Sequence, residues 1–103
     1  MRGSEYIDME RSRREYLRWI ILLALYHARP YGASEGVILN ACRDIPIVTT
    51  LDMIRKELKS LEKRGLVVVK EGAEWYAEIT ALGEDIVEYR EDPPKGIYRP
   101  PQW

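Results

Sequence analysis

The chain lacks the residues from which disulfides and most zinc sites are built. Its 103 residues include one cysteine, Cys42, and one histidine, His27. A single cysteine cannot form an internal disulfide, and one Cys with one His falls short of the ligand count of a structural zinc ion. We therefore predict no metal and no other cofactor, and we expect a reducing, cytoplasmic setting.

Long apolar runs are missing as well. The most apolar stretch spans residues 19–25, which is far shorter than the roughly 18 residues that suggest a transmembrane helix. The start of the chain also lacks a signal-peptide pattern, because the arginines at positions 11, 13, 14 and 18 follow acidic residues instead of opening the chain. We expect no membrane span.

The residue sets of common catalytic sites are absent too. With one His and one Cys, neither a Ser/His/Asp nor a Cys/His arrangement can be assembled, and no glycine-rich phosphate loop is present. The carboxylates lie near cations or in turns that we expect to be exposed. We predict that the chain is not an enzyme.

Charge is nearly balanced over the whole chain but unevenly distributed. The net charge is -1; residues 1–30 carry six Lys or Arg against four Asp or Glu, whereas residues 66–103 carry four against eight. A domain that holds DNA by charge alone is usually far more basic. Composition therefore weighs against nucleic-acid binding before any motif is considered.

Apolar spacing predicts a long first helix from about Met9 to about His27. One stripe of this helix has the spacing of a buried face: Leu17, Ile20, Ile21, Ala24 and Ala28. A second apolar stripe lies beside it: Tyr16, Trp19, Leu23 and Tyr26. Such a helix either lies at the centre of the domain or buries its spare stripe against a second copy, so we predict a homodimer through this second stripe.

Two more helices are expected before residue 66. Ser34 is suited to cap a short second helix, and Pro46 ends it because it disfavours a helical Ile45. Thr49 or Thr50 is expected to cap a third helix that ends at Gly65. The expected inner residues are Val37, Ile38, Ala41 and Cys42 in the second helix and Leu51, Ile54, Leu58 and Leu61 in the third.

A hairpin, a short helix and a tail complete the chain. Residues 66–70 and 74–79 have the composition of strands around a turn at 71–73. Thr80 is expected to cap the last helix, whose predicted inner residues are Leu82, Ile86, Val87 and Tyr89. We assign residues 1–91 to one domain and 92–103 to a proline-rich, extended tail. The apolar tail residues Ile97, Tyr98 and Trp103 either pack on the domain or contact a partner.

The order helix, helix, turn, helix, hairpin, helix resembles the winged helix-turn-helix family. The resemblance is carried by residues 53–67, MIRKELKSLEKRGLV, where the third helix ends in glycine and enters a strand, and by residues 79–83, ITALG, where a strand enters a capped helix. It implies a mainly α fold with a three-helix core, a two-stranded wing and a short C-terminal helix. The chain also looks like the small winged-helix proteins of Mu-like phages and prophages. Its residues 94–100 are similar to their Pro-Gly-x-x-Arg-Pro ending apart from an inserted Lys95, which suggests a phage context.

In winged-helix proteins the third helix commonly enters the major groove and the wing touches the DNA backbone. In this chain the predicted outward line of the third helix holds Asp52, Lys56, Lys59 and Lys63, with Arg55 beside it. The resemblance therefore implies a phage or prophage transcriptional regulator that binds double-stranded DNA. Because four or five cations on one face support only weak binding, we expect a dimer that presents two such helices. The predicted DNA contacts are Thr49, Thr50, Arg55, Lys56, Lys59, Lys63 and Lys70.

Other features favour an alternative. Asp52 repels phosphate, Glu71 and Glu74 make the tip of the wing negative, and any solvated helix of this composition carries lysines outside. The alternative is a protein-interaction adaptor on the same scaffold, with contacts through the acidic wing, the last helix and the tail residues Tyr98 and Trp103. A continuous positive surface across the third helix and the start of the first favours the regulator, and a broken one beside an apolar patch favours the adaptor.

Overall fold

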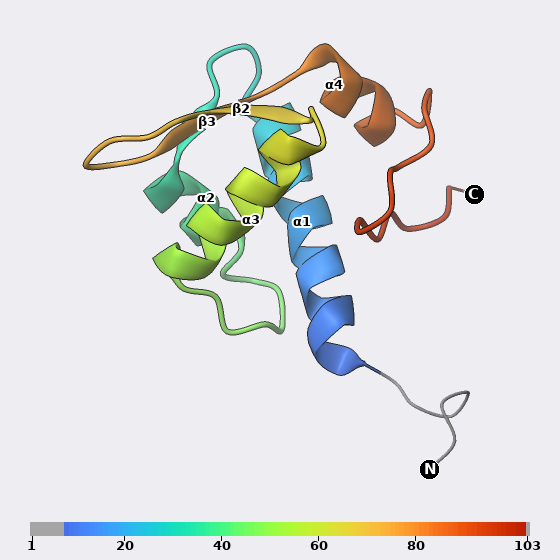
Figure 1. Ribbon diagram of the computed structural model, residues 1–103, viewed down its shortest axis with the longest axis horizontal. Coiled ribbons are helices and arrows are strands. Elements are labelled where there is room, and N and C mark those ends of the chain that lie inside the picture. The colour runs from blue at the N-terminus through green and yellow to red at the C-terminus, as the bar shows by residue number, and fades with distance from the viewer. Residues whose placement is uncertain (1–7, 103) are drawn as a thin grey trace.

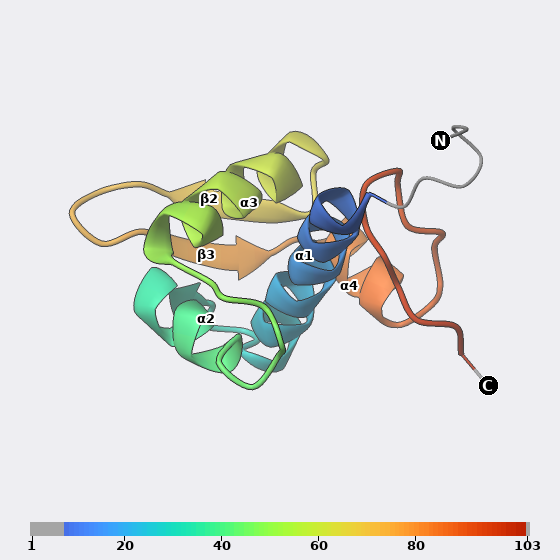
Figure 2. The same cartoon turned by 90° about the horizontal axis from the view of Figure 1, so that it is seen from below.

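A computed structural model describes residues 8–102 of the chain. Its elements, in order, are α1 (Met9–His27), β1 (Ala33–Ser34), α2 (Glu35–Ala41), α3 (Leu51–Lys63), β2 (Val67–Lys70), β3 (Tyr76–Ile79) and α4 (Ala81–Val87). Helices α1, α2 and α3 pack together beside a small sheet, and α4 with the C-terminal segment lies along the other side of α1 (Figures 1 and 2). The predicted mainly α fold with a hairpin wing is confirmed. Within the described residues, no helix is long and apolar enough to cross a membrane.

The sheet has one strand more than the sequence predicts. Its order is β1-β3-β2 and both pairings are antiparallel; in the wing, Val67 faces Ile79 and Lys70 faces Tyr76. The added strand, β1, spans only two residues and pairs Ala33 with Ala77. A two-residue strand is too short to show an alternating pattern, so the sequence gives no indication of it.

Side-chain caps begin the helices as expected. The hydroxyl oxygens of Ser34, Thr50 and Thr80 accept hydrogen bonds from the backbone N–H three residues later, at 3.3, 3.2 and 3.1 Å. Thr50 rather than Thr49 is therefore the cap of α3. The Thr49 hydroxyl instead donates to the Ile47 carbonyl at 3.1 Å and stabilises the preceding turn.

The core lies where α1, α2 and α3 meet the sheet. Buried positions that the sequence predicts correctly are Leu17, Ile21, Ile38, Cys42, Ile54, Leu58, Leu61, Ile86 and Val87. Four predicted core residues are instead exposed: Val37, Ala41, Leu51 and Leu82. In α2 the buried face is turned toward Glu35, and in α4 it is centred on Gly83, which lies against the Leu66 carbonyl. Helices of two turns contain too few apolar residues for the sequence to show which side is buried. Leu51 is exposed because it is the first residue of α3.

The second apolar stripe of α1 is partly covered within the same chain. Trp19 is 5% exposed and packs edge-on against Tyr89, with ring centroids 6.5 Å apart. Tyr16 lies 6.1 Å from Tyr98 of the tail. The remaining two stripe residues, Leu23 and Tyr26, are half-buried against the core. Trp19 is therefore unavailable to a second copy, while the other three stripe residues stay partly accessible, and a dimer through this stripe stays a prediction.

The tail is fixed to the domain through its backbone carbonyls. Arg18 donates to the Gly96 carbonyl at 2.7 Å, and Arg64 donates to the Lys95 carbonyl at 3.0 Å. Ile97 is buried, so for this residue the packing alternative is confirmed. Tyr98 is 48% exposed, and Trp103 lies outside the described residues. The tail forms neither helix nor strand over the part that is described.

Candidate nucleic-acid interface

The outward face of α3 has the orientation predicted from its sequence. Ile54, Leu58 and Leu61 are fully buried on the inner side. The opposite side exposes the four residues of the predicted outward line: Asp52, Lys56, Lys59 and Lys63. With 13 residues, α3 is about 20 Å long. It lies at the front of the molecule in Figure 1 and beside the wing in Figure 2.

Two of the predicted DNA-contacting lysines are paired with carboxylates. The Lys59 ammonium donates to Glu71 of the wing at 2.8 Å and to Glu62 at 2.9 Å. These hydrogen bonds raise the pKa of Lys59, and the bond donated to Glu71 contributes most. Lys70 lies 3.4 Å from Glu78. The positive potential predicted at the wing side of α3 is therefore largely compensated.

Arg55 is held by a buried carboxylate at the start of α2. Its guanidinium donates to both oxygens of Glu35, at 2.6 and 2.8 Å, and Glu35 is 3% exposed. The hydrogen bonds from Arg55, helped by one from the Trp75 N–H at 3.0 Å, lower the pKa of Glu35 to about 2. Arg55 also lies over the Trp75 ring and donates to the Ala73 carbonyl. The structure thus gives Arg55 the role of joining α2, α3 and the wing, which the sequence pattern does not indicate.

Three of the predicted contacts keep an unused charge or donor. Lys56 and Lys63 are exposed, and neither forms an ion pair within residues 8–102. The Thr50 oxygen accepts the capping bond from Met53, which leaves its O–H free to donate. Thr49, in contrast, has committed its O–H to Ile47.

The wing carries the opposite charge from the one a DNA backbone requires. Between residues 67 and 79 there is one lysine, Lys70, against three glutamates, Glu71, Glu74 and Glu78. Glu71 and Glu74 are exposed at the turn. The predicted negative tip is confirmed, and it lies next to the C-terminal half of α3 through the Lys59–Glu71 contact.

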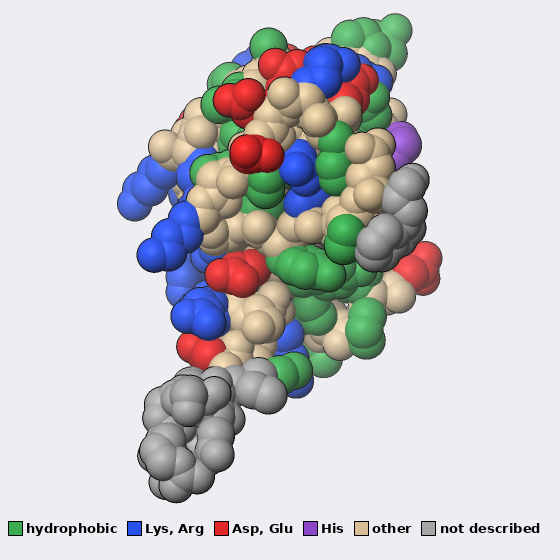
Figure 3. Space-filling view, turned by 90° about the vertical axis from the view of Figure 1, so that its right-hand side faces the viewer, with side chains coloured by type: hydrophobic (Ala, Val, Ile, Leu, Met, Phe, Trp, Pro, Cys, Tyr) green, Lys and Arg blue, Asp and Glu red, His purple; other side chains and the backbone are tan. Residues whose placement is uncertain are grey.

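A second group of cations borders α3 on the side away from the wing. Arg13 and Arg14 line a groove of about 390 Å³ that also includes Val48 and Met53. Basic side chains gather along the left edge of Figure 3, the side on which α3 lies. Neither of these arginines is among the predicted DNA contacts. Their position could have been predicted in part, because the i, i+4 spacing of Arg13 and Leu17 places these two residues on one face of α1.

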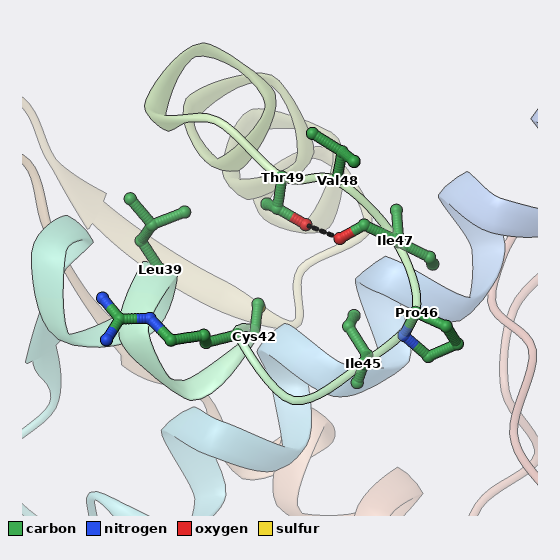
Figure 4. Close-up of a pocket in the computed structure, with 8 residues that line it drawn as sticks. Leu39, Cys42, Ile45, Pro46, Ile47, Val48 and Thr49 are labelled. Atoms are coloured by element: carbon green, nitrogen blue, oxygen red, sulfur yellow. Dashed lines mark hydrogen bonds between the residues drawn. The ribbon is translucent and has the colours of Figure 1, made fainter.

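A pocket of about 490 Å³ lies at the connection between α2 and α3 (Figure 4). Leu39 of α2 and Cys42, the residue that follows this helix, form one side of it, and the segment up to Thr49 forms the other. Val48 at its rim is 88% exposed. Burial raises the pKa of the Cys42 thiol to about 11, so this thiol is neutral at physiological pH.

Neither pocket has the chemistry of a metal centre. Within the part of the chain that the structure describes, no three His, Cys, Asp or Glu side chains gather closely enough to hold an ion. The groove at Arg13 and Arg14 is cationic and the pocket at Cys42 is mostly apolar.

The crystal structure of SSV1 F-93 is similar in fold to this chain. It matches with a TM-score of 0.50 and 18% sequence identity, over 73% of this chain and 90% of F-93. The chain therefore has a winged-helix fold, with the β2–β3 hairpin as its wing. No family model and no curated protein sequence matches the chain. The expected relation to Mu-like phages has no support from these similarities.

Proposed function

We propose that this chain binds double-stranded DNA through the outward face of α3 and acts as a transcriptional regulator. The supporting observation is that Lys56 and Lys63 are exposed and free of ion pairs within residues 8–102, on the helix that this fold presents to the major groove. An α-helix with its side chains, about 10–12 Å across, fits a groove about 12 Å wide. Thr50 adds a hydroxyl donor at the start of the helix.

The charge pattern implies weak and salt-dependent binding by a single copy. Lys59 can add to the contact, because a surface ion pair contributes only about 0–1 kcal/mol and phosphate can replace its carboxylates. A handful of phosphate contacts supports a Kd on the order of 10⁻⁴ to 10⁻⁶ M at physiological salt. Tighter binding requires two copies that present two such helices.

A titration of a labelled random-sequence duplex, followed by fluorescence anisotropy, tests this proposal. The logarithm of the binding constant should fall linearly with the logarithm of the salt concentration. Lys63→Gln should reduce that slope by about 0.9, the value for one phosphate contact, and Lys56→Gln/Lys63→Gln by about twice as much. Arg90→Gln removes the same charge as Lys63→Gln from the far side, near Asp85 of α4, and should leave the slope unchanged.

The second candidate function is the protein-interaction adaptor. It is favoured by the exposed Val48 at the rim of the α2–α3 pocket and by the acidic wing. The tail contributes less to this function than expected, because its carbonyls and Ile97 are engaged by the domain. A folded wild-type protein that does not bind the duplex at about 50 mM salt would reject DNA binding and favour the adaptor.

A further inference from the structure

We propose that DNA seated on α3 is held on its flank by Arg13 and Arg14 of α1, and that the wing makes no stabilising backbone contact. This inference rests on the proposed function and specifies which side of the interface grips the phosphates. In winged-helix proteins the wing commonly contacts the DNA backbone beside the recognition helix, whereas here the first helix would make this contact. Its basis is the position of the two arginines and the charge of the two flanks of α3.

The positions of Arg13 and Arg14 follow from how α1 extends beyond the core. Arg13 is one turn before Leu17, the first buried residue of α1, so it continues the inward-facing side of the helix past the end of the core. There it borders the groove whose opposite wall includes Met53 of α3. The two arginines therefore lie beside the first half of α3 rather than on a remote surface.

These two arginines are also available for a ligand. Within residues 8–102, neither of them forms an ion pair or a side-chain hydrogen bond. Their neighbour Arg18 differs, because it is engaged by the buried Glu57 at 2.7 Å and by the Gly96 carbonyl. Arg11 lies 4.0 Å from Glu15. Arg13 and Arg14 are thus the arginines of α1 whose guanidinium groups are unoccupied in the described part of the chain.

The two flanks of α3 differ in sign. On one side lie Arg13 and Arg14, with Glu10 as the acidic residue in the same groove. On the other side lies the wing, with three glutamates and one lysine. A helix in the major groove has a phosphate strand on each side, and DNA carries one charge per about 1.7 Å of its axis. The strand on the α1 side is therefore attracted and the strand on the wing side is repelled.

The duplex titration described above tests this asymmetry with four variants. Arg13→Gln/Arg14→Gln should weaken binding about tenfold at low salt and reduce the salt slope by about 1.8, the value for two phosphate contacts. Arg13→Lys/Arg14→Lys should keep most of the slope, because it keeps both charges. Glu10→Gln removes the negative charge that repels phosphate in this groove, so it should strengthen binding by about two- to threefold. Lys70→Gln, on the wing, should bind within about twofold of wild type.

The outcomes separate this inference from the proposed function. If Lys56→Gln/Lys63→Gln loses binding but Arg13→Gln/Arg14→Gln binds like wild type, the flank assignment is wrong and DNA binding by α3 stands. A loss in Lys70→Gln as large as that in the arginine variant would also overturn the assignment. If wild type shows no salt-dependent binding, the proposed function fails and this inference with it. Thermal unfolding of each variant verifies that the compared proteins are folded.

Discussion

Arg55 in the middle of α3 and Glu35 at the start of α2 are joined by two hydrogen bonds, at 2.6 and 2.8 Å. The same carboxylate accepts from the Trp75 N–H, and the same guanidinium donates to the Ala73 carbonyl. One ion pair therefore connects the two helices of the helix-turn-helix to the turn of the wing. Because Glu35 is buried and Arg55 closes it off from solvent, the pair fixes the orientation of α3 relative to the sheet.

Removing the arginine of this pair should destabilise the fold. Arg55→Ala leaves the Glu35 carboxylate buried without its main partner, so we expect the free energy of unfolding to fall by about 2 kcal/mol. The value is below that of a fully buried pair because the Arg55 side chain is partly exposed. Arg55→Lys should recover only part of the loss, since an ammonium cannot form the bidentate contact. Urea unfolding measures both, and Lys56→Ala, a neighbouring exposed cation, should change stability by less than about 0.5 kcal/mol.

The same pair should make stability depend on acid pH. The pKa of Glu35 is about 2 in the folded chain, against an ordinary value of 4.5. A carboxyl whose pKa is depressed on folding stabilises the fold above its ordinary pKa, and this stabilisation is lost as the pH falls from 4.5 toward 2. Urea unfolding over this range should therefore show a smaller loss for Glu35→Gln than for wild type. If the free energy of unfolding changes with pH in the same way in the two proteins, the pKa of Glu35 is not lowered by folding.

The tail should contribute to stability through one buried side chain. Ile97 is buried against the core, so Ile97→Ala should lower the free energy of unfolding by about 2 kcal/mol or more. Tyr98→Ala is the matched control, because its side chain is 48% exposed and its ring packs against Tyr16 at the surface; we expect a loss of about 1 kcal/mol or less. Equal losses in the two variants, measured by urea unfolding, would contradict the packing described for residue 97.

The backbone of the tail offers an independent test of its docking. Gly96 has a φ of +99°, and a Cβ at this position would collide with the Arg64 guanidinium. Because a residue with a Cβ is strained at this φ and the guanidinium would have to move away from the Lys95 carbonyl, Gly96→Ala should destabilise the chain by about 1–2 kcal/mol. Gly72→Ala, in the exposed turn of the wing, has room for a Cβ and serves as the control. Thermal unfolding of the two variants should differ accordingly, and a Gly96→Ala protein as stable as wild type would argue against this docking.

The parts of the fold that the sequence predicts are those encoded by local patterns. α1 and α3 have regular apolar spacing over several turns, and Ser34, Thr50 and Thr80 are capping residues whose effect depends only on the next three residues. Where the pattern is short, rotation errors follow: Val37 and Leu82 are exposed because α2 and α4 have two turns each and their buried faces are set by packing.

The candidate site was harder to predict because its electrostatics depend on distant partners. Glu35 and Arg55 are 20 residues apart, and Lys59 meets Glu71 only because the wing folds back beside α3. No spacing rule in the sequence links such residues. For this reason, the seven predicted DNA contacts include three cations whose charge is paired with a carboxylate in the structure: Arg55, Lys59 and Lys70. The availability of Arg13 beside α3 depends likewise on how far α1 extends past the core.

The most direct test of DNA binding by α3 and α1 is an NMR titration of the labelled protein with a short random-sequence duplex. We predict that backbone amide shifts move most along α3 around Lys56 and Lys63 and at Arg13 and Arg14 of α1. Amides at the wing turn and in α4 should move least. Shifts concentrated on the wing, α4 and Tyr98, or no shifts at low salt, would contradict the account.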